Sequence, residues 1–337
     1  MGHRRFERQE RFEPLGKGGQ ERLEAARVAI VGCGALGGVL AQTLTRAGVG
    51  TLVLIDRDVV EETNLHRQVL FEDRHADAGS AKVDAARETL ARIGGPTRFE
   101  PHALHVDSEN VLDLIEGADL VLDGTDNLAT RYLLNDACVR EHIPWVYAGV
   151  VAGGGLVMPI PVGGKPCLRC VFPSPAPAGL LPTCDTAGVL PPAVGAVASL
   201  QAGLGLRMLV QEGLEPALIQ LDVWTGETRR LRVPGNADCP CCAGREFPFL
   251  EQDGPASTEV LCGRNAVQVR GDGHAPDFDA LERNLTGIAS ELKRAGTFMR
   301  FQVEDASMTV FPDGRALVQG TEDSDRALAL YDRYVGS

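Results

Sequence analysis

Residues 28–37, VAIVGCGALG, constrain the fold of this chain more than any other segment. A short apolar run leads into Gly32, Gly34 and Gly37, and a largely apolar stretch continues to residue 47. The run predicts a buried strand, the glycines predict a tight turn, and the stretch after them predicts a helix. In this order, the glycines let the backbone approach a phosphate group at the N-terminus of a helix. We therefore expect a nucleotide-binding α/β sheet.

The same alternation continues to residue 150. Further strands are predicted at residues 51–56, 98–103, 119–123 and 145–150, and helices at 80–92, 108–116 and 127–141, after a polar helical arm at 4–24. Strands that alternate with helices imply a mostly parallel sheet that is covered on both faces. The predicted fold class is α/β, with a Rossmann-like doubly wound sheet.

Beyond residue 150 the pattern changes. Gly- and Pro-rich segments, including a predicted mobile crossing loop at residues 173–182, come before a long apolar helix at 191–210. Residues 218–223 and 229–233 predict a hairpin that returns to the sheet and leads to a pair of cysteines that could bind zinc. Residues 246–257 contain proline and glycine and predict a linker.

The tail has a pattern of its own. It predicts a strand at 266–270, a helix at 278–294, strands at 298–303, 308–311 and 315–318, and a final helix at 323–334. We expect two domains. Residues 1–250 carry the nucleotide site, and residues 258–337 form a small α+β domain of unknown role.

The 337-residue chain carries a formal net charge of −13. This charge argues against a general nucleic-acid or anionic-membrane surface, because both of those partners are anionic. No stretch has the roughly 18 uninterrupted apolar residues of a membrane span, and the charged start has no apolar signal core behind it. We expect a cytoplasmic protein that binds neither nucleic acid nor membranes.

Asp56 closes the second strand, where it can accept hydrogen bonds from ribose hydroxyls. Together with the glycines, this carboxylate equally suits a nicotinamide-dependent dehydrogenase. A second set of polar groups shifts the balance toward a triphosphate with Mg²⁺, because cations and carboxylates together neutralise its charge. These candidates are Asp58, Asn64, Arg67, Gln68, Lys82, Asp123, Asp126 and Asn127.

With these motifs in this order, residues 4–245 resemble the MoeB/ThiF/HesA family, relatives of the ubiquitin-activating enzymes. The resemblance implies a homodimer that adenylates the C-terminal glycine carboxylate of a ubiquitin-like sulfur-carrier protein, ThiS- or MoaD-like. The products would be the carrier acyl-adenylate, for later thiocarboxylate formation, and pyrophosphate. The thiamine, molybdopterin or other pathway is not determined by these motifs.

The resemblance also assigns roles to residues. Gly34 and Asp56 would hold the adenosine half of ATP, and Asp126 would orient Mg²⁺. Arg8, in the RFERQ start, would reach the γ-phosphate of the neighbouring subunit. The remaining phosphate contacts would come from Asn64, Arg67, Gln68 and Lys82.

Nine cysteines in a cytoplasmic chain favour metal ligation or thiol chemistry over disulfides. Two Cys-x-x-Cys pairs have the spacing of a closed structural Zn²⁺ site. Two redox pairs or plain buried thiols are the alternatives, and Cys241 is left spare. The proposed ligands are Cys167, Cys170, Cys239 and Cys242.

Cys184, in the segment TCDTAGV, resembles the family cysteine that can take the activated carrier as a thioester or acyl-persulfide-type adduct. An inert loop thiol is the alternative, since a cysteine needs neighbours that lower its pKa. Cys33, Cys138 and Cys262 lie in apolar contexts and are interpreted as core residues.

The segments LCGRNAVQV and TVFPDGRALVQG resemble a short extra domain of some bacterial ThiF-like proteins. We find no rhodanese-like module, so a separate sulfur donor is expected, such as a cysteine desulfurase or rhodanese. A nicotinamide-dependent oxidoreductase and a non-catalytic carrier-binding scaffold remain the alternatives to adenylation. The tRNA-modifying branch of the same superfamily is a narrower possibility, disfavoured by the paired cysteines.

Overall fold

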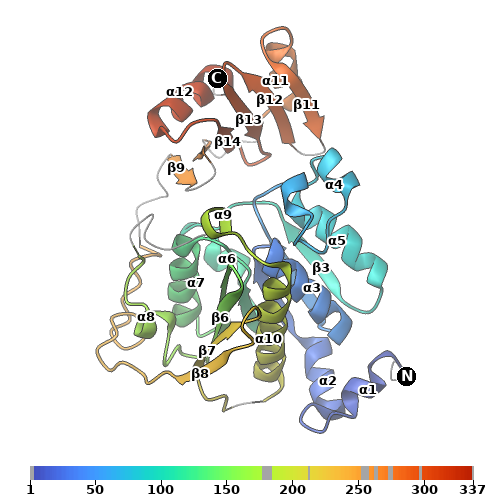
Figure 1. Ribbon diagram of the computed structural model, residues 1–337, viewed down its shortest axis with the longest axis vertical. Coiled ribbons are helices and arrows are strands. Elements are labelled where there is room, and N and C mark those ends of the chain that lie inside the picture. The colour runs from blue at the N-terminus through green and yellow to red at the C-terminus, as the bar shows by residue number, and fades with distance from the viewer. Residues whose placement is uncertain are drawn as a thin grey trace.

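The computed structural model describes residues 4–176, 184–211, 213–251, 258–261, 265–271, 276–295 and 298–335, and two sheets organise them (Figure 1). The first sheet has eight strands in the order β3-β2-β1-β4-β5-β6-β7-β8. Its parallel part comprises β1 (Arg27–Val31), β2 (Thr51–Ile55), β3 (Arg98–His102), β4 (Leu120–Asp123) and β5 (Trp145–Val151). Val31 is in register with both Ile55 and Asp123. The predicted α/β class is confirmed.

Three antiparallel strands extend this sheet: β6 (Gly154–Ile160), β7 (Ala217–Asp222) and β8 (Thr228–Arg232). The β7–β8 hairpin agrees with the prediction, whereas no strand was predicted at β6. A Cβ on Gly155 would lie 2.4 Å from the carbonyl oxygen of Gly149, so this strand needs glycine where it approaches its neighbour. β8 ends the sheet and is exposed throughout.

Helices cover both faces of the sheet. On one face lie α3 (Ala35–Ala47), α5 (Lys82–Ile93) and α10 (Pro191–Val210), and on the other α6 (Val111–Leu114) and α7 (Leu128–Arg140). Successive β1 residues alternate between the two cores, with Ile30 facing α3 and Val31 facing α6 and α7.

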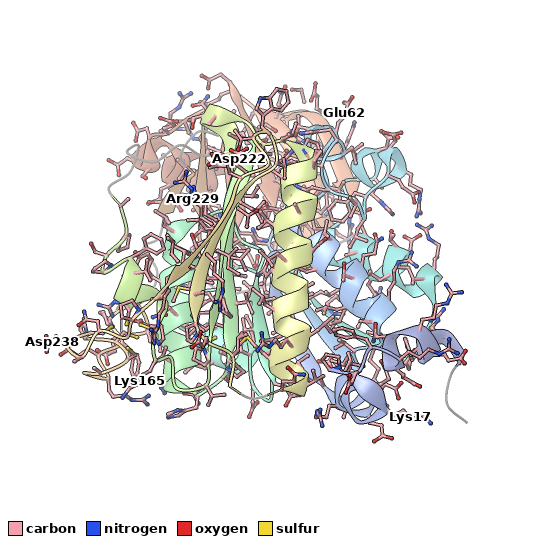
Figure 2. The ribbon with its side chains drawn as sticks, turned by 60° about the horizontal axis from the view of Figure 1, so that its bottom comes forward. Lys17, Glu62, Lys165, Asp222, Arg229 and Asp238 are labelled. Atoms are coloured by element: carbon pink, nitrogen blue, oxygen red, sulfur yellow. The ribbon has the colours of Figure 1, made fainter. Side chains whose placement is uncertain are left out.

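α10 is long and apolar enough to cross a membrane by composition, with a mean hydropathy of 1.5. It instead lies lengthwise on the sheet (Figure 2). Gln201 in its middle donates hydrogen bonds to the carbonyl oxygens of Asp123 and Val146, at 2.8 and 2.9 Å. Such a helix belongs to the core of the sheet.

The N-terminal arm is helical, as predicted, but has three pieces: η1 (Arg4–Phe6), α1 (Glu7–Glu10) and α2 (Gly16–Ala25). Phe6 is buried beside Gly48, and Gln9 Nε2 donates to the carbonyl oxygen of Ala47 at 2.9 Å. The arm is therefore anchored at the C-terminal end of α3.

Short helical segments complete the first region. They are η2 (Glu62–Asn64), α4 (Asp73–Asp77), α8 (Leu168–Val171) and α9 (Cys184–Ala187). The predicted linker at 246–257 is wrong for its first residues. Phe247 is buried, and the backbone N–H of Phe249 donates to Asp136 Oδ2 at 3.2 Å. Residues 252–257 lie outside the described part of the chain.

The second sheet is antiparallel, in the order β11-β12-β13-β14-β10-β9. Its strands are β9 (Thr258–Leu261), β10 (Ala266–Val269), β11 (Ser290–Ala295), β12 (Phe298–Val303), β13 (Ala306–Val310) and β14 (Ala316–Gln319). With α11 (Phe278–Leu285) and α12 (Ser324–Tyr334) it encloses a core of its own.

The helix predicted at 278–294 is therefore wrong in its second half. α11 ends at Leu285, Gly287 has a φ of +84°, and Ser290–Ala295 form the edge strand β11. Pairing with β12 overrides the helix-favouring composition of this segment.

Candidate functional site

The glycine turn packs directly against the end of β4. Gly32 has a φ of +91°, and a Cβ there would lie 2.6 Å from the carbonyl carbon of Gly124. A Cβ on Gly37 would lie 1.8 Å from the carbonyl oxygen of Gly32. Side chains at these positions are excluded, so α3 begins immediately behind the turn with its N-terminal N–H groups available to an anion.

Asp56 is tied to this turn by its carboxylate. Oδ2 accepts from the backbone N–H of Cys33 at 2.6 Å, and Oδ1 accepts from that of Asp58 at 2.8 Å. Burial raises the pKa of Asp56, and the nearby Lys82 opposes that shift. Burial also raises the pKa of Cys33 well above its ordinary value, so this thiol stays protonated and belongs to the core.

Lys82 and Asp58 form an ion pair beside Asp56. Lys82 Nζ lies 2.9 Å from Asp58 Oδ2, and the lysine side chain is 7% exposed. The backbone N–H of Lys82 also donates to the carbonyl oxygen of Asp58 at 3.0 Å. The cation is thereby held next to the Asp56 carboxylate and the glycine turn.

Residues 64–68 come from η2 and the turns after it. Gln68 is buried, and its Nε2 would lie 3.6 Å from a Cβ on Gly34, so the two residues are adjacent. Its Oε1 is buried without a hydrogen-bond partner among the described residues. Asn64, the last residue of η2, accepts from the backbone N–H of the N-cap residue Glu61 in a capping box. Arg67 is partly exposed, and its Nη1 donates to the carbonyl oxygen of Thr63 at 2.8 Å.

The segment after β4 divides into supporting and exposed residues. Asp123 has a fully buried carboxylate that accepts from Thr125 and pairs with Arg131, so it supports the loop rather than facing a ligand. Asn127 caps α7 by accepting from the backbone N–H of Thr130 at 2.8 Å. Asp126 is exposed, next to residues that contact the glycine turn.

Sequence reasoning missed two residues that hold this loop. Arg131 reaches Asp123 at 3.2 Å, the carbonyl oxygen of Thr125 at 2.7 Å and that of Ala148 at 3.1 Å. Burial raises the pKa of Asp123, and the guanidinium of Arg131 opposes that shift. Gln201 fixes the same strand ends from α10. The sequence did offer one signal for Arg131: it follows the N-cap residue Asn127 by about one helical turn, which places its side chain near the loop before the helix.

Arg8 is not part of this cluster. It is exposed on α1, which is anchored at the far end of α3. A 13-residue helix is roughly 20 Å long, so Arg8 lies about that far from the glycine turn of its own chain. In Figure 2, Lys17 of α2 and Glu62 of η2 likewise lie at opposite ends of the molecule.

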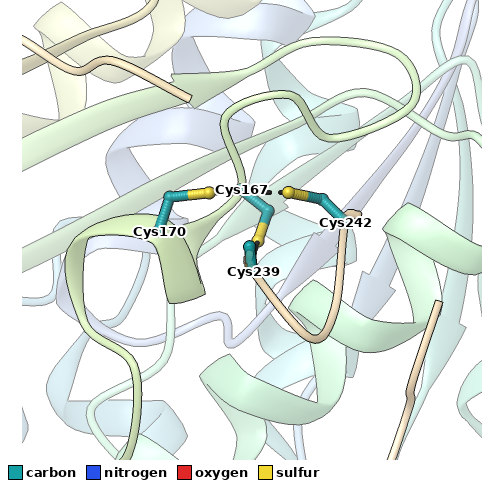
Figure 3. Close-up of side chains that lie close together, drawn as sticks. All are labelled: Cys167, Cys170, Cys239 and Cys242. Carbon is teal, nitrogen blue, oxygen red and sulfur yellow. Dashed lines mark hydrogen bonds between the residues drawn. The ribbon is translucent and has the colours of Figure 1, made fainter. Parts of the chain in front are cut away.

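The two cysteine pairs meet, although about 70 residues separate them (Figure 3). All four sulfur atoms lie within 4.8 Å of one another; Cys167 and Cys239 are 3.7 Å apart, and Cys170 and Cys242 are 3.5 Å apart. Burial and the neighbouring Cys167 raise the pKa of Cys242. Cys241 is not one of these four; its sulfur lies 3.2 Å from Asn135 Nδ2 and also contacts Cys167.

Cys184 begins α9, and its side chain lies outside the described part of the structure. Residues 177–182, which are most of the crossing loop predicted at 173–182, and Cys262 lie outside it as well. Cys138 is fully buried, as expected of a core residue.

One large hollow lies at the opposite end of the sheet. It is lined by residues that precede β1, β4 and β5, among them Ala26, Asp119 and Pro144. Ligands of open parallel sheets bind at the carboxyl ends of the strands. The candidate site is therefore the polar cluster around the glycine turn.

Comparison with known proteins agrees with this geometry. The ThiF family model matches residues 6–241. The chain belongs to the ThiF family. A sulfur carrier protein ThiS adenylyltransferase of Bacillus subtilis (strain 168) is 37% identical over 341 residues, covering 98% of this chain and 99% of the relative. An adenylyltransferase and sulfurtransferase MOCS3 of Sus scrofa is 41% identical over 268 residues.

Coverage differs between these two ThiF-family relatives. The MOCS3 match takes in 78% of this chain but only 57% of the relative. Among solved structures, E. coli MccB with ATP shares the fold, with a TM-score of 0.62, 22% identity, and coverage of 72% of this chain and 75% of that one.

Proposed function

We propose that this ThiF-family protein uses ATP to adenylate the C-terminal glycine carboxylate of a ubiquitin-like sulfur carrier. The 37% identity to a ThiS adenylyltransferase over nearly the whole of both chains carries the proposal. The polar cluster around the glycine turn supports this proposal. The cluster offers a cation and several carboxylates, whereas a dinucleotide site needs only one carboxylate, for the ribose. The nicotinamide-dependent and scaffold alternatives have no such support.

Each residue of the cluster then has a role. The N-terminus of α3 and Gly34 approach the phosphates, and Asp56 accepts hydrogen bonds from ribose hydroxyls. Gln68 and Lys82 offer N–H groups to the phosphates from the other side of the turn. The same side of the site is completed by Asn64, Arg67 and Asp58, of which Asn64 and Asp58 orient neighbouring residues.

The chemistry needs no protein nucleophile. A carboxylate oxygen of the carrier forms a bond to the α-phosphorus, and the bond from that phosphorus to the bridging oxygen of pyrophosphate breaks. The leaving pyrophosphate takes the electron pair. Asp126, exposed beside the turn, would hold Mg²⁺, which when bound neutralises charge on the phosphates. Lys82 and the helix N-terminus stabilise the charge that remains.

Arg8 supports a shared site in a homodimer. Its distance of roughly 20 Å from its own glycine turn, estimated along α3, argues against a role within one chain. Its exposure leaves it available to the site of a partner subunit.

The cysteine cluster fits a structural Zn²⁺. Zn–S bonds of about 2.3 Å place tetrahedral sulfurs roughly 3.8 Å apart, close to the 3.5 and 3.7 Å of the two closest pairs. Cys167, Cys170, Cys239 and Cys242 would hold the ion and join the β6–α8 segment to the segment after β8. Reduced thiolates of this kind suit the cytoplasm, where we place the protein.

Cys184 and a separate sulfur donor would act after adenylation. Cys184 lies at the start of α9 and would take the activated carrier covalently. The carrier's later thiocarboxylate then needs sulfur from another protein, such as a cysteine desulfurase or rhodanese. We assign residues 1–250 to the adenylation domain and 258–337 to an appended domain.

Carrier-dependent exchange of labelled pyrophosphate into ATP tests the proposal. We expect exchange with a ThiS- or MoaD-like carrier that ends in glycine, and none with the same carrier lacking that residue. Titration calorimetry should show ATP binding with Mg²⁺ and no NAD binding. NAD binding without ATP binding would contradict the proposed activity.

A further inference from the structure

The C-terminal sheet reaches the nucleotide site at one backbone atom. Arg315 Nη2 donates a hydrogen bond to the carbonyl oxygen of Arg57. Arg57 stands between Asp56 and Asp58, the two carboxylates that contact the glycine turn and Lys82. A side chain 258 positions away in sequence therefore fixes the backbone between them.

Arg315 is held firmly at its own end. It is 4% exposed, its Nε donates to Asp313 Oδ2 at 2.9 Å, and its guanidinium lies 3.7 Å from the ring centroid of Phe311. Burial lowers the pKa of Arg315, but arginine starts so high that the group stays charged. A charged donor in a fixed orientation makes a stronger hydrogen bond than a neutral one.

A second contact joins the same two regions. Arg270, beside β10, lies 2.5 Å from Glu109 Oε2 and 3.4 Å from Asp107 Oδ2, in the loop after β3. Between the two contacts, Arg57 Nη1 lies 2.9 Å from His105 Nδ1. Burial and the adjacent Arg57 lower the pKa of His105 to about 3. The ring is neutral at pH 7, so Nδ1 accepts from Arg57.

These contacts form a continuous path. The C-terminal sheet fixes the carbonyl oxygen of Arg57 through Arg315, and His105 fixes the Arg57 side chain. Asp56 and Asp58 then have little freedom to turn away from the glycine turn and from Lys82. In Figure 1 the C-terminal sheet lies at the end of the molecule that carries α4 and α9.

We propose that Arg315 is a positioning residue for ATP, through which the C-terminal region sets the orientation of Asp56 and Asp58. The proposal rests on the proposed function and deepens it, since it gives residues 258–337 a part in nucleotide binding. Coupling of this kind is reciprocal, so ATP also strengthens the docking of the C-terminal sheet.

The test uses the full-length chain with Arg315→Ala, Arg315→Lys and, as a matched control, Arg333→Ala. Arg333 is exposed on α12 and pairs with Glu304 inside the C-terminal region. In Arg315→Ala we expect the KM and Kd for ATP to rise roughly tenfold, with the KM for the carrier within about twofold. Arg315→Lys should recover part of the loss, and Arg333→Ala should behave as wild type.

Unchanged ATP affinity in Arg315→Ala would overturn the proposal, as would equal losses in Arg315→Ala and Arg333→Ala with lowered melting temperatures. If Arg315→Ala does not fold, Arg270→Ala tests the same interface from a side chain that is 35% exposed. It should also raise the KM for ATP, and an unchanged KM would overturn the proposal. Calorimetry separates the two ideas: wild-type protein that binds ATP without exchanging pyrophosphate contradicts only the adenylation function.

Discussion

Lys82 Nζ lies 2.9 Å from Asp58 Oδ2, and Lys82 is also the first residue of α5. A cation at the N-terminus of a helix is disfavoured by the helix dipole. Only 7% of this side chain is exposed, so water compensates little of that cost. Asp58 holds the ammonium group where an anionic ligand of the glycine turn would gain from it.

Lys82→Ala should lower carrier-dependent pyrophosphate exchange by roughly 10- to 150-fold, the range for losing one charged hydrogen bond. Lys293→Ala is the control, since Lys293 is an exposed lysine of β11. Initial exchange rates at saturating carrier give the comparison. A rate within twofold of wild type in Lys82→Ala would remove this lysine from the phosphate site.

Asp126→Ala should abolish exchange while leaving the melting temperature nearly unchanged, because an exposed carboxylate contributes little to packing. The contrasting variant is Asp123→Asn, whose buried side chain pairs with Arg131. That variant should lower the melting temperature, since burial of unpaired polar groups is costly. Thermal unfolding and pyrophosphate exchange are measured on the same preparations. If both variants lost activity without a lower melting temperature, the structural role assigned to Asp123 would be wrong.

Arg8 should act across a dimer interface. Arg8→Ala and Lys82→Ala are each expected to lose most of their activity alone, whereas a mixture of the two forms hybrid dimers with one complete site. With random 1:1 exchange of subunits in a two-fold dimer, about one quarter of the sites regain both groups. Differently tagged chains verify the exchange. No recovered activity despite confirmed hybrid dimers would place Arg8 outside the reaction.

Freshly purified reduced protein should contain about one zinc per chain. Cys170→Ser should lose the metal and lower the melting temperature, because the free energy of metal binding is part of the free energy of folding. Cys241→Ser should keep the metal, since the Cys241 sulfur contacts Asn135 and lies outside the four-sulfur cluster. If metal analysis showed zinc in Cys170→Ser and none in Cys241→Ser, Cys241 rather than Cys170 would be the zinc ligand.

Cys184→Ala should keep pyrophosphate exchange but lose any covalent adduct with the carrier and slow sulfur transfer, because adenylation needs no thiol. Intact-mass spectrometry of a non-reduced reaction with carrier, ATP and sulfur donor measures the adduct. An adduct of undiminished abundance in Cys184→Ala would show that another thiol carries it, with Cys241 the first to examine.

The sequence predicted the parallel strands and the glycine turn because their signals are local: apolar runs, closely spaced glycines and a strand-end carboxylate at Asp56. β6 was missed because Gly154 and Gly155 resemble loop residues until β5 and β7 approach them. The composition from Ser290 to Ala295 predicts a helix, and only pairing with β12 makes the segment a strand. Both errors concern contacts distant in sequence.

The candidate site likewise contains residues that local motifs predict and residues that depend on contacts distant in sequence. Motif residues such as Lys82 could be found from the chain, but nothing local distinguishes Asp123, which is buried on Arg131, from Asp126, which is exposed. Arg315 could not be found at all. It lies just before β14 of the other sheet, and its bond to Arg57 exists only once both sheets are folded.

The hairpin that closes the large sheet also bears on how the protein stays dispersed in solution. β8 is the last strand of the sheet, is exposed over its whole length, and carries Arg229, Arg230 and Arg232. Outer strands offer backbone groups to which a second sheet can add, a common route to aggregation. If two copies met along β8, these arginines would come close to their counterparts, and like charges opposite one another destabilise strand pairing. Repulsion between like charges thus keeps one copy from extending the sheet of another.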